Sequence, residues 1–306
     1  MALRIADQAG TTDVGRQRST NEDSLFCAPP FFAVADGMGG AKAGEVASGI
    51  AVQVFEERRD DSQEPAEAQL TAMLQEANRR IYELSTDDES RRGMGTTLTA
   101  AKVEDGKVSL AHVGDSRAYR LRDGSLEQIT KDHSLVAELE RSGQISPEAA
   151  VHHPQRSIIT RALGPEPDVE VDTYTVPGRS GDVFLLCSDG LTGMVSDDEV
   201  ATILRGADSL GEAADALVRA ANQSGGKDNI TVVLFSLDEA VAEEEETEPA
   251  APAPDETVAG ALQATEVAAA APATETGAAD RDTTAPPVEP AAPRAEPVAE
   301  PAARAR

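Results

Sequence analysis

The sequence predicts an α+β fold in which the strands pair in antiparallel fashion and the helices form separate segments. Two Asp-Gly pairs, at 105–106 and 123–124, each separate two short runs that are rich in apolar and β-branched residues. Asp-Gly at such a place is a strong signal for a tight hairpin, and a hairpin joins antiparallel strands. Two longer segments repeat apolar residues every three or four positions, as one face of a helix does. A doubly wound parallel sheet is therefore not expected.

The first half of the chain is expected to contain strands, then two helices, then a meander of strands. Three early strands are predicted, at 3–9, 24–28 and 31–35. Apolar periodicity predicts one helix over 43–58 and a second from Pro65 to about residue 84, where Pro suits the first turn. The meander follows in four strands, at 96–103, 107–113, 118–122 and 125–129.

The second half begins with a polar segment, 132–164, that holds three of the four histidines and is expected to form an inserted surface subdomain. One helix is predicted in it at 135–142, and another starts at 146–148. A strand is expected at 182–187. Two Ser-x-x-Glu capping boxes then predict helices that begin at Ser196 and Ser209. The last strand is expected at 230–237.

Residues 238–306 differ in composition from the rest of the chain. They include 16 acidic and 4 basic residues, ten prolines and no aromatic residue, and Ala, Pro and Glu dominate. Such a segment buries too little apolar surface to offset the entropy cost of ordering. We expect a folded domain at 1–237 and a disordered acidic tail at 238–306.

The overall charge and composition exclude several classes of protein. The net charge of −28 argues against a nucleic-acid or anionic-membrane partner. Apolar runs stay short of the ~18 residues of a membrane span, and the N-terminus lacks a signal-peptide core. Two cysteines cannot build a disulfide framework. These features predict a cytoplasmic protein without membrane insertion.

Acidic residues recur at the ends of the predicted apolar strands. Four aspartates stand where such runs stop or begin, and an acidic pair precedes them: Asp36, Asp115, Asp189, Asp228 and the pair Glu22-Asp23. A carboxylate is costly to bury, and several close together repel one another. A divalent cation with oxygen ligands removes both problems. The pattern therefore favours a metal site whose ligands the fold gathers from along the chain.

Two nearby motifs fit a site for a metal-bound phosphate. Residues 36–40, Asp-Gly-Met-Gly-Gly, place three glycines directly after a strand, so the backbone must turn tightly with something close to it. An ordinary tight turn explains this motif equally well when it is taken alone. Arg18 precedes the acidic pair, and Arg suits bidentate phosphate binding, although a solvated loop with a local ion pair has the same sequence.

Competing chemistries have little support in the sequence. Cys187 has no following Arg at the spacing of a cysteine-phosphatase loop, and it is expected to be a buried small apolar residue. No Gly-x-Ser-x-Gly elbow and no nucleotide-binding glycine motif is present. His152-His153 lacks zinc-ligand partners, and His112, inside a strand, is expected to be packed or hydrogen-bonded.

Taken in order, the motifs resemble those of a bacterial protein phosphatase of the PPM family (protein phosphatase type 2C). The resemblance covers about residues 5–237. It rests on six motifs in sequence order: Arg18-x-x-Asn21-Glu22-Asp23, Asp36-Gly37-Met38-Gly39-Gly40, Gly93-Met94-Gly95-Thr96-Thr97, Gly114-Asp115-Ser116-Arg117, Ser188-Asp189-Gly190 and Asp228-Asn229.

This resemblance implies a four-layer αββα sandwich, with two central antiparallel sheets flanked by helices, and a catalytic domain at 1–237. It also implies two Mn²⁺ or Mg²⁺ ions, with a third, weaker one in bacterial members. The segment 132–164 matches the flap beside the active site. Arg18 matches the phosphate-binding arginine, and Asp36 matches the ligand that bridges the two ions. The positions that match the metal ligands are Glu22, Asp23, Asp36, Gly37 (through its carbonyl), Asp115, Asp189 and Asp228.

The resemblance further implies the hydrolysis of phosphoserine and phosphothreonine in proteins, by direct attack of a hydroxide that bridges the two metal ions. Met38 stands where animal members carry a His, so the general acid stays unassigned. The expected partners are phosphorylated proteins, namely Hanks-type Ser/Thr kinases and their substrates, and the chain is expected to be a monomer. Two alternatives stay open: a phosphatase of a phosphorylated sigma-factor regulator, and a non-catalytic phosphoprotein-binding scaffold.

Overall fold

The structure is a computed structural model that describes residues 3–39, 43–57, 64–87, 91–146, 149–150 and 153–239. The tail expected at 238–306 lies outside the described residues, except for 238–239. Pro147, Glu148 and His152 also lie outside them. None of the helices in the described ranges has the length and apolar character that crossing a bilayer requires.

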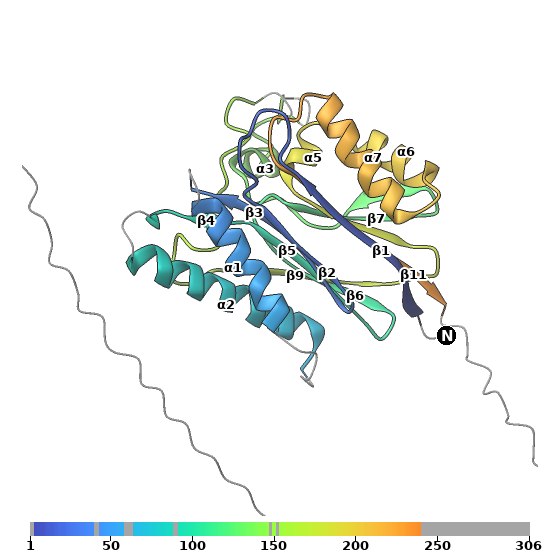
Figure 1. Cartoon of the computed structure of the whole chain (residues 1–306), viewed down its shortest axis with the longest axis horizontal. Helices are drawn as coiled ribbons and strands as arrows, with labels where there is room; N and C mark the ends of the chain where they lie inside the picture. The colour runs from blue at the N-terminus through green and yellow to red at the C-terminus, as the bar shows by residue number, and fades with distance from the viewer. Residues whose placement is uncertain are drawn as a thin grey trace, which may run out of the picture. The chain divides into compact units, whose positions relative to one another are not determined.

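Two antiparallel sheets form the centre of the domain (Figure 1). The strand order in the first sheet is β1 (Leu3–Asp13), β11 (Ile230–Glu239), β10 (Val183–Cys187), β7 (Arg117–Arg122) and β8 (Ser125–Gln128). The order in the second sheet is β2 (Asp23–Ala28), β3 (Phe31–Met38), β5 (Leu98–Glu104), β6 (Lys107–Val113) and β9 (Asp172–Pro177), and the short β4 (Gly95–Thr96) pairs with β3.

Helices cover the outer face of each sheet, which gives the four layers expected of an αββα sandwich (Figure 1). The second sheet packs against α1 (Ala43–Glu57) and α2 (Ala66–Asp87) in one apolar cluster. The first sheet packs against three helices in another cluster: α5 (Asp189–Thr192), α6 (Asp197–Gly206) and α7 (Leu210–Gln223). The short α3 (Leu135–Arg141) lies in the segment between β8 and β9.

Successive side chains of the buried strands point to opposite faces of each sheet. Each sheet therefore contributes both to the core between the sheets and to the core under its helices. In β3, Phe32 and Val34 point between the sheets, while Phe31, Ala33 and Ala35 face α1 and α2. Strand side chains alternate between faces, so a strand that is buried on both sides becomes a continuous apolar run. The strands β10 and β11 divide their side chains in the same way.

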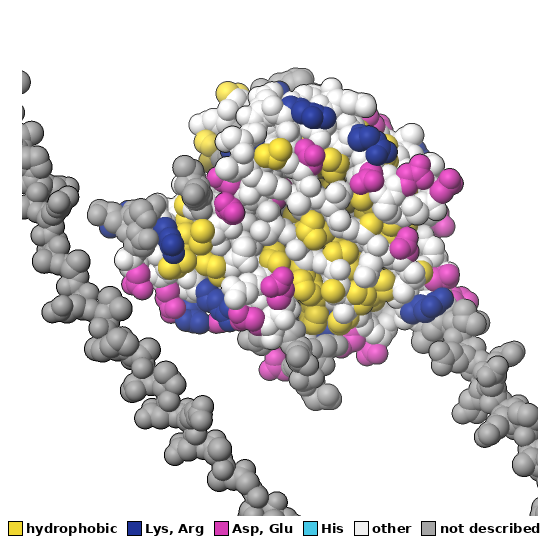
Figure 2. Space-filling view, viewed as in Figure 1, with side chains coloured by type: hydrophobic (Ala, Val, Ile, Leu, Met, Phe, Trp, Pro, Cys, Tyr) yellow, Lys and Arg dark blue, Asp and Glu magenta, His cyan; other side chains and the backbone are white. Residues whose placement is uncertain are grey.

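The edge strands of the two sheets, β1 and β2, lie side by side on one face of the domain. Apolar side chains gather on this face between them (Figure 2). The partly buried residues Ile5, Leu25 and Cys27 come from these two strands and pack against the core between the sheets. The sandwich is therefore only thinly covered where the two edges meet.

Both hairpins expected at Asp-Gly pairs are present. Asp105 and Gly106 have φ values of 49° and 71°, and Asp123 and Gly124 have 52° and 79°. Two successive residues with positive φ define the type I′ turn that suits antiparallel strands. The expected helix starts are also confirmed, because the Ser196 hydroxyl accepts from the Glu199 amide at the start of α6, and Ser209 caps α7 likewise.

Several elements differ from the expectation. The strand β9 was not predicted, although its burial alternates along its length, because its polar residues carry little apolar signal. The strand expected at 96–103 is interrupted at Thr97, whose amide donates to the Asp36 carbonyl. The last strand ends at Glu239, so the ordered part of the chain reaches two residues into the segment expected to be disordered.

Replacing Phe235 by Ala should lower the free energy of unfolding by about 3–5 kcal/mol, since a buried Phe is lost and a cavity remains. The Phe235 ring lies between two other rings, 4.2 Å from Phe32 and 5.1 Å from Phe184 between centroids. Urea unfolding of the full chain measures the loss. The control is Val14→Ala, at a side chain that is 36% exposed, which should change stability by less than about 0.5 kcal/mol. Equal losses for the two variants would contradict the packing described.

Candidate functional site

The fold brings the predicted acidic residues to one end of the sandwich. Asp23 begins β2 and is the register partner of Asp36 near the end of β3. Asp189 follows β10, and Asp228 precedes β11, which pairs with β10 in antiparallel register. Since the end of one antiparallel strand lies beside the start of its partner, these two residues also share an end. Asp115 follows β6 at the same end.

Electrostatics show that these carboxyl groups are close enough to repel one another. Burial raises the pKa of Asp36 well above its usual value, and the charges of Asp23, Asp189, Asp115 and Asp228 raise it further. Burial and then the charge of Asp228 also raise the pKa of Asp189, an effect that hydrogen bonding with Asp36 partly offsets. A cluster of this kind favours either protons or a bound cation.

Asp23 is the carboxylate that joins the two sheets. Its Oδ2 accepts hydrogen bonds from Ser188 Oγ at 2.8 Å and from Thr231 Oγ1 at 2.6 Å, both in the other sheet or directly after one of its strands. Its Oδ1 is buried and has no hydrogen-bond partner among the described residues. Asp115 Oδ1 is likewise buried and has no hydrogen-bond partner among the described residues. Burial raises the pKa of both carboxyl groups, and nearby aspartates add to the effect.

Asn229 holds the loop that carries Arg18 against the start of β11. Its Nδ2 donates to the carbonyls of Val14 and Thr20 at 3.0 and 2.9 Å, and its Oδ1 accepts from the Glu22 amide at 2.8 Å. The Arg18 guanidinium pairs with Asp228 at 2.7 Å, and half of the Arg18 side chain is exposed. Sequence reasoning placed Asn229 in a motif but gave it no role. Its neighbours Ser188 and Thr231 were likewise not recognised as partners of Asp23.

The glycines at this end are required because backbone segments cross in close contact. A Cβ on Gly37 would stand 2.2 Å from the Gly44 carbonyl oxygen and 2.5 Å from that of Glu22. A Cβ on Gly190 would stand 1.9 Å from the Asn229 carbonyl oxygen. The glycine-rich motif predicted that something lies close to the backbone. At Gly37 this close neighbour is the start of α1. Since Glu22 Oε2 would be 2.5 Å from a Cβ on Gly44, the Glu22 carboxylate also lies against this helix.

Small hydroxyl side chains connect the turn at Asp115 to the end of β3 that carries Asp36. The Thr97 hydroxyl accepts from the Asp36 amide at 3.1 Å and pairs with the Ser116 hydroxyl at 2.8 Å. Thr97 and Ser116 are fully buried. Asp36, near the end of β3, and Asp115, just after β6, are thus fixed relative to each other through backbone and hydroxyl contacts, without use of either carboxylate.

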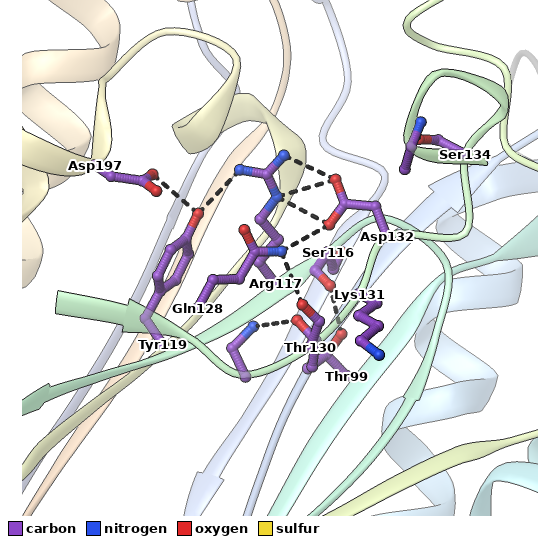
Figure 3. Close-up of polar contacts among 12 residues, drawn as sticks. Thr99, Ser116, Arg117, Tyr119, Gln128, Thr130, Lys131, Asp132, Ser134 and Asp197 are labelled. Atoms are coloured by element: carbon purple, nitrogen blue, oxygen red, sulfur yellow. Dashed lines mark hydrogen bonds and ion pairs between the residues drawn. The ribbon is translucent and has the colours of Figure 1, made fainter. Parts of the chain in front are cut away.

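Arg117, two residues after Asp115, organises a second group of polar contacts (Figure 3). Its guanidinium makes a bidentate ion pair with Asp132, with the shortest contact at 2.8 Å, and donates to the Tyr119 hydroxyl at 3.0 Å. Tyr119 in turn donates to Asp197 in the first turn of α6 at 3.1 Å. The beginning of segment 132–164 is therefore tied both to the loop of Asp115 and to a covering helix.

The cysteine and histidine expected to be structural are buried in the core. Cys187 is fully buried, and burial raises the pKa of its thiol to about 12, which leaves no thiolate at neutral pH. His112 is also fully buried, and its Nδ1 shares a hydrogen bond of 2.8 Å with the Thr99 hydroxyl. Burial and the neighbouring His133 lower the pKa of His112 to about 4. Neither side chain is placed for catalysis.

The donor atoms of the site fit a hard divalent cation better than a soft one. Every candidate ligand offers oxygen, which suits Mn²⁺ or Mg²⁺. The unpartnered oxygens of Asp23 and Asp115 are buried acceptors that such an ion could satisfy. As the side chains stand, no three Asp, Glu, His or Cys residues in the described ranges are grouped tightly enough to hold an ion. Among the candidate ligands, Asp228 is at present paired with Arg18.

Comparison with known proteins decides the family. The sequence model described as protein phosphatase 2C matches residues 16–234, which is most of the chain. The chain belongs to the protein phosphatase 2C (PPM) family. Its enzyme class is accordingly that of the protein serine/threonine phosphatases, and its relatives are bacterial.

Individual relatives support this placement over the whole described domain. The serine/threonine phosphatase stp of Listeria monocytogenes (strain F2365) is 46% identical over 237 residues, which cover 74% of this chain and 94% of that protein. Protein phosphatase PhpP of Streptococcus pneumoniae (strain D39) is 40% identical over 241 residues, which cover 76% of this chain and 98% of that protein.

Solved structures of this family share the fold. The Mycobacterium tuberculosis serine/threonine phosphatase PstP/Ppp superposes with a TM-score of 0.73 at 41% identity, over 78% of this chain and all of that one. The catalytic domain of PstP in complex with two manganese ions gives 0.71 at 39% identity, over 78% of this chain and 99% of that one. The expected PPM sandwich is thereby confirmed.

Replacing Gly190 by Ala should displace the crossing of the Asp189 loop over Asn229 and weaken Mn²⁺ binding at least about tenfold, because the clash is with backbone that cannot move aside. Isothermal titration calorimetry measures the affinity. The control is Gly49→Ala in α1, where a Cβ would meet nothing within 4 Å. That variant should bind Mn²⁺ normally and be slightly more stable, since Ala favours a helix. Normal Mn²⁺ affinity in the Gly190 variant would contradict the close approach described.

Proposed function

We propose that this chain hydrolyses phosphoserine and phosphothreonine in proteins with the help of two Mn²⁺ or Mg²⁺ ions. One observation carries the proposal. Asp36 is the register partner of Asp23 and lies at the same end of the sandwich as Asp115, Asp189 and Asp228. Burial raises the pKa of Asp36, and the charges of these four aspartates raise it further. Carboxylates gathered in this way repel one another unless cations lie between them. The family assignment supplies the reaction class, protein dephosphorylation.

The proposed ligands are those expected from the family, assigned residue by residue. Asp36 would bridge the two ions, and the Gly37 carbonyl, Asp189 and Asp228 would complete their protein ligands. The Glu22-Asp23 pair would hold the ions directly or through waters, and Asp115 would bind a third, weaker one. The buried Oδ1 atoms of Asp23 and Asp115, which have no partner in the described part of the chain, support these two assignments.

The chain's own residues would position the substrate and stabilise its charge. Bound divalent ions lower the pKa of a water towards neutrality and neutralise phosphoryl charge. Arg18 would bind the phosphoryl oxygens, because its guanidinium is half exposed and its loop is fixed by Asn229. Binding requires Arg18 to share or leave Asp228. Met38 lies where a side-chain general acid would be expected, so the leaving oxygen is proposed to take its proton from water.

The biological role proposed is to reverse the action of Ser/Thr kinases on themselves and on their substrates. The relatives that support it carry the names serine/threonine phosphatase stp, PhpP and PstP. A monomeric enzyme in the cytoplasm, with residues 132–164 as a flap and the acidic tail as a solubilising extension, fits the composition of the chain.

The proposal predicts hydrolysis of a phosphothreonine peptide in the presence of Mn²⁺ and its loss in EDTA. Asp36→Asn should reduce the rate at least about a hundredfold, because several kcal/mol of transition-state stabilisation by the ions is lost. It should also reduce Mn²⁺ affinity in calorimetry. The matched control is Asp123→Asn in the β7–β8 hairpin, where Asn tolerates the positive φ of 52°.

Full activity in EDTA, or an unchanged rate in the Asp36 variant, would reject the metal-dependent reaction. No phosphopeptide hydrolysis by the wild-type chain under any divalent ion would instead favour the binding scaffold. The Asp123 variant should match the wild type in both rate and affinity, so a general effect of replacing an aspartate is excluded.

A further inference from the structure

Two cationic residues border the pair formed by Arg18 and Asp228 in sequence, and neither belongs to the proposed metal and phosphate site. We infer that Arg16 and Lys227 form a subsite for an anionic group on the substrate chain, close to the phosphorylated residue. This inference rests on the proposed function, since it concerns which phosphoproteins that site prefers. The group recognised would be the carboxylate of an acidic residue or a second phosphoryl group.

Backbone contacts place the chain segments that carry Arg16 and Lys227 beside each other and near Arg18. The Arg16 amide donates to the Gly226 carbonyl at 2.7 Å, and the Gln17 amide donates to the same oxygen at 3.2 Å. Lys227 directly follows Gly226. A Cβ on Gly226 would stand 2.8 Å from Arg16 Cγ, so the stem of the Arg16 side chain lies over this glycine. Arg18 lies two residues further along the same loop.

The loops that carry these residues are held firmly. Asp13 Oδ1 accepts from the Gly15 amide at 2.8 Å and from Asn222 Nδ2 at 3.0 Å. A Cβ on Gly15, whose φ is 81°, would stand 2.2 Å from the Asp228 carbonyl oxygen. Only a glycine permits this approach. A cation on a fixed backbone loses less entropy on binding a ligand than one on a mobile loop.

Two carboxylates beside these cations, those of Asp13 and Asp228, already have partners. Asp13 accepts the two hydrogen bonds described above, and Asp228 pairs with Arg18 and accepts from the Asn229 amide at 2.9 Å. Arg16 and Lys227 are exposed, and their side chains form no ion pair or hydrogen bond with any residue in the described ranges. Their charges are therefore available to a ligand.

The charges of Arg16 and Lys227 are opposite in sign to the net charge of the chain. The chain carries a net charge of −28, and its general field would favour substrates with basic residues. At physiological ionic strength the field of exposed charges is screened within about 8 Å. Groups that flank a phosphorylated residue bound at Arg18 would therefore respond to nearby charges, and these include the cations Arg16 and Lys227. Arg16 and Lys227 thus favour substrates with acidic residues next to the phosphorylated residue, while the net charge of the chain favours substrates with basic residues.

Phosphothreonine peptides of one sequence test this inference, with Glu, a second phosphoserine, Gln or Lys at the flanking positions. The measured value is kcat/KM with Mn²⁺, divided by that of the same variant for p-nitrophenyl phosphate. For the wild type, each anionic flank should exceed Gln by about threefold to tenfold, as expected for one or two exposed ion pairs. The advantage should fall at about 1 M salt, where screening is strong.

The decisive variant reverses both charges, Arg16→Glu with Lys227→Glu, and should shift the preference from the anionic peptides to the Lys peptide. Its control is Arg4→Glu with Lys107→Glu, which changes the net charge equally. Arg4 lies about 30 Å from Asp13 along β1, and Lys107 begins β6 beside the hairpin at 105–106. The control should retain the wild-type preference.

The inference is overturned if the wild type favours the Lys or Gln peptide, or if the control shifts the preference as much as the reversal does. These outcomes would leave the proposed function intact, because phosphopeptides would still be hydrolysed. Failure to hydrolyse any of the four peptides would overturn the proposed function and this inference with it. A larger advantage for the second phosphoryl group than for Glu would identify multiply phosphorylated segments as the preferred substrates.

Discussion

Several aspartates that repel one another are held together at one end of the sandwich. Asp23 and Asp115 are buried, and Asp36 and Asp189 are half-buried beside them, so each charge disfavours its neighbours. A fold gains no stability from such an arrangement without protons or cations. The proposed binding of cations for phosphoryl chemistry would account for such a cluster at the meeting point of two sheets.

Hydrogen bonds and close backbone contacts around this unfavourable cluster hold it in place. Ser188 and Thr231 donate to Asp23 from the opposite sheet, and Asn229 fixes the loop of Arg18. Backbone contacts at Gly37 and Gly190 leave no space for a side chain. These neutral groups are short and rigid, so they position the carboxylates without neutralising them. Stability and function are thereby divided between different residues at the same end of the fold.

Much of this arrangement was readable in the sequence, because some signals are local. The Asp-Gly hairpins, the serine caps and the apolar runs ending in Asp36 or Asp189 each reflect a short stretch of chain. The role of Asn229 could not be predicted, because its partners, Val14 and Thr20, are about 200 residues away in sequence. The polar strand β9 was not predicted for a related reason. It is a strand because it pairs with β6, and its own composition gives little signal of this.

The account depends on cations binding between carboxylates that otherwise repel. Anomalous diffraction from crystals of the full chain grown with Mn²⁺ tests this most directly, because the signal locates manganese independently of the protein's oxygen positions. The account predicts two strong anomalous peaks in contact with the Asp36 carboxylate, with Asp189 and Asp228 also among the ligands. Data that show no peak at Asp36, or manganese only elsewhere on the acidic surface, would contradict it.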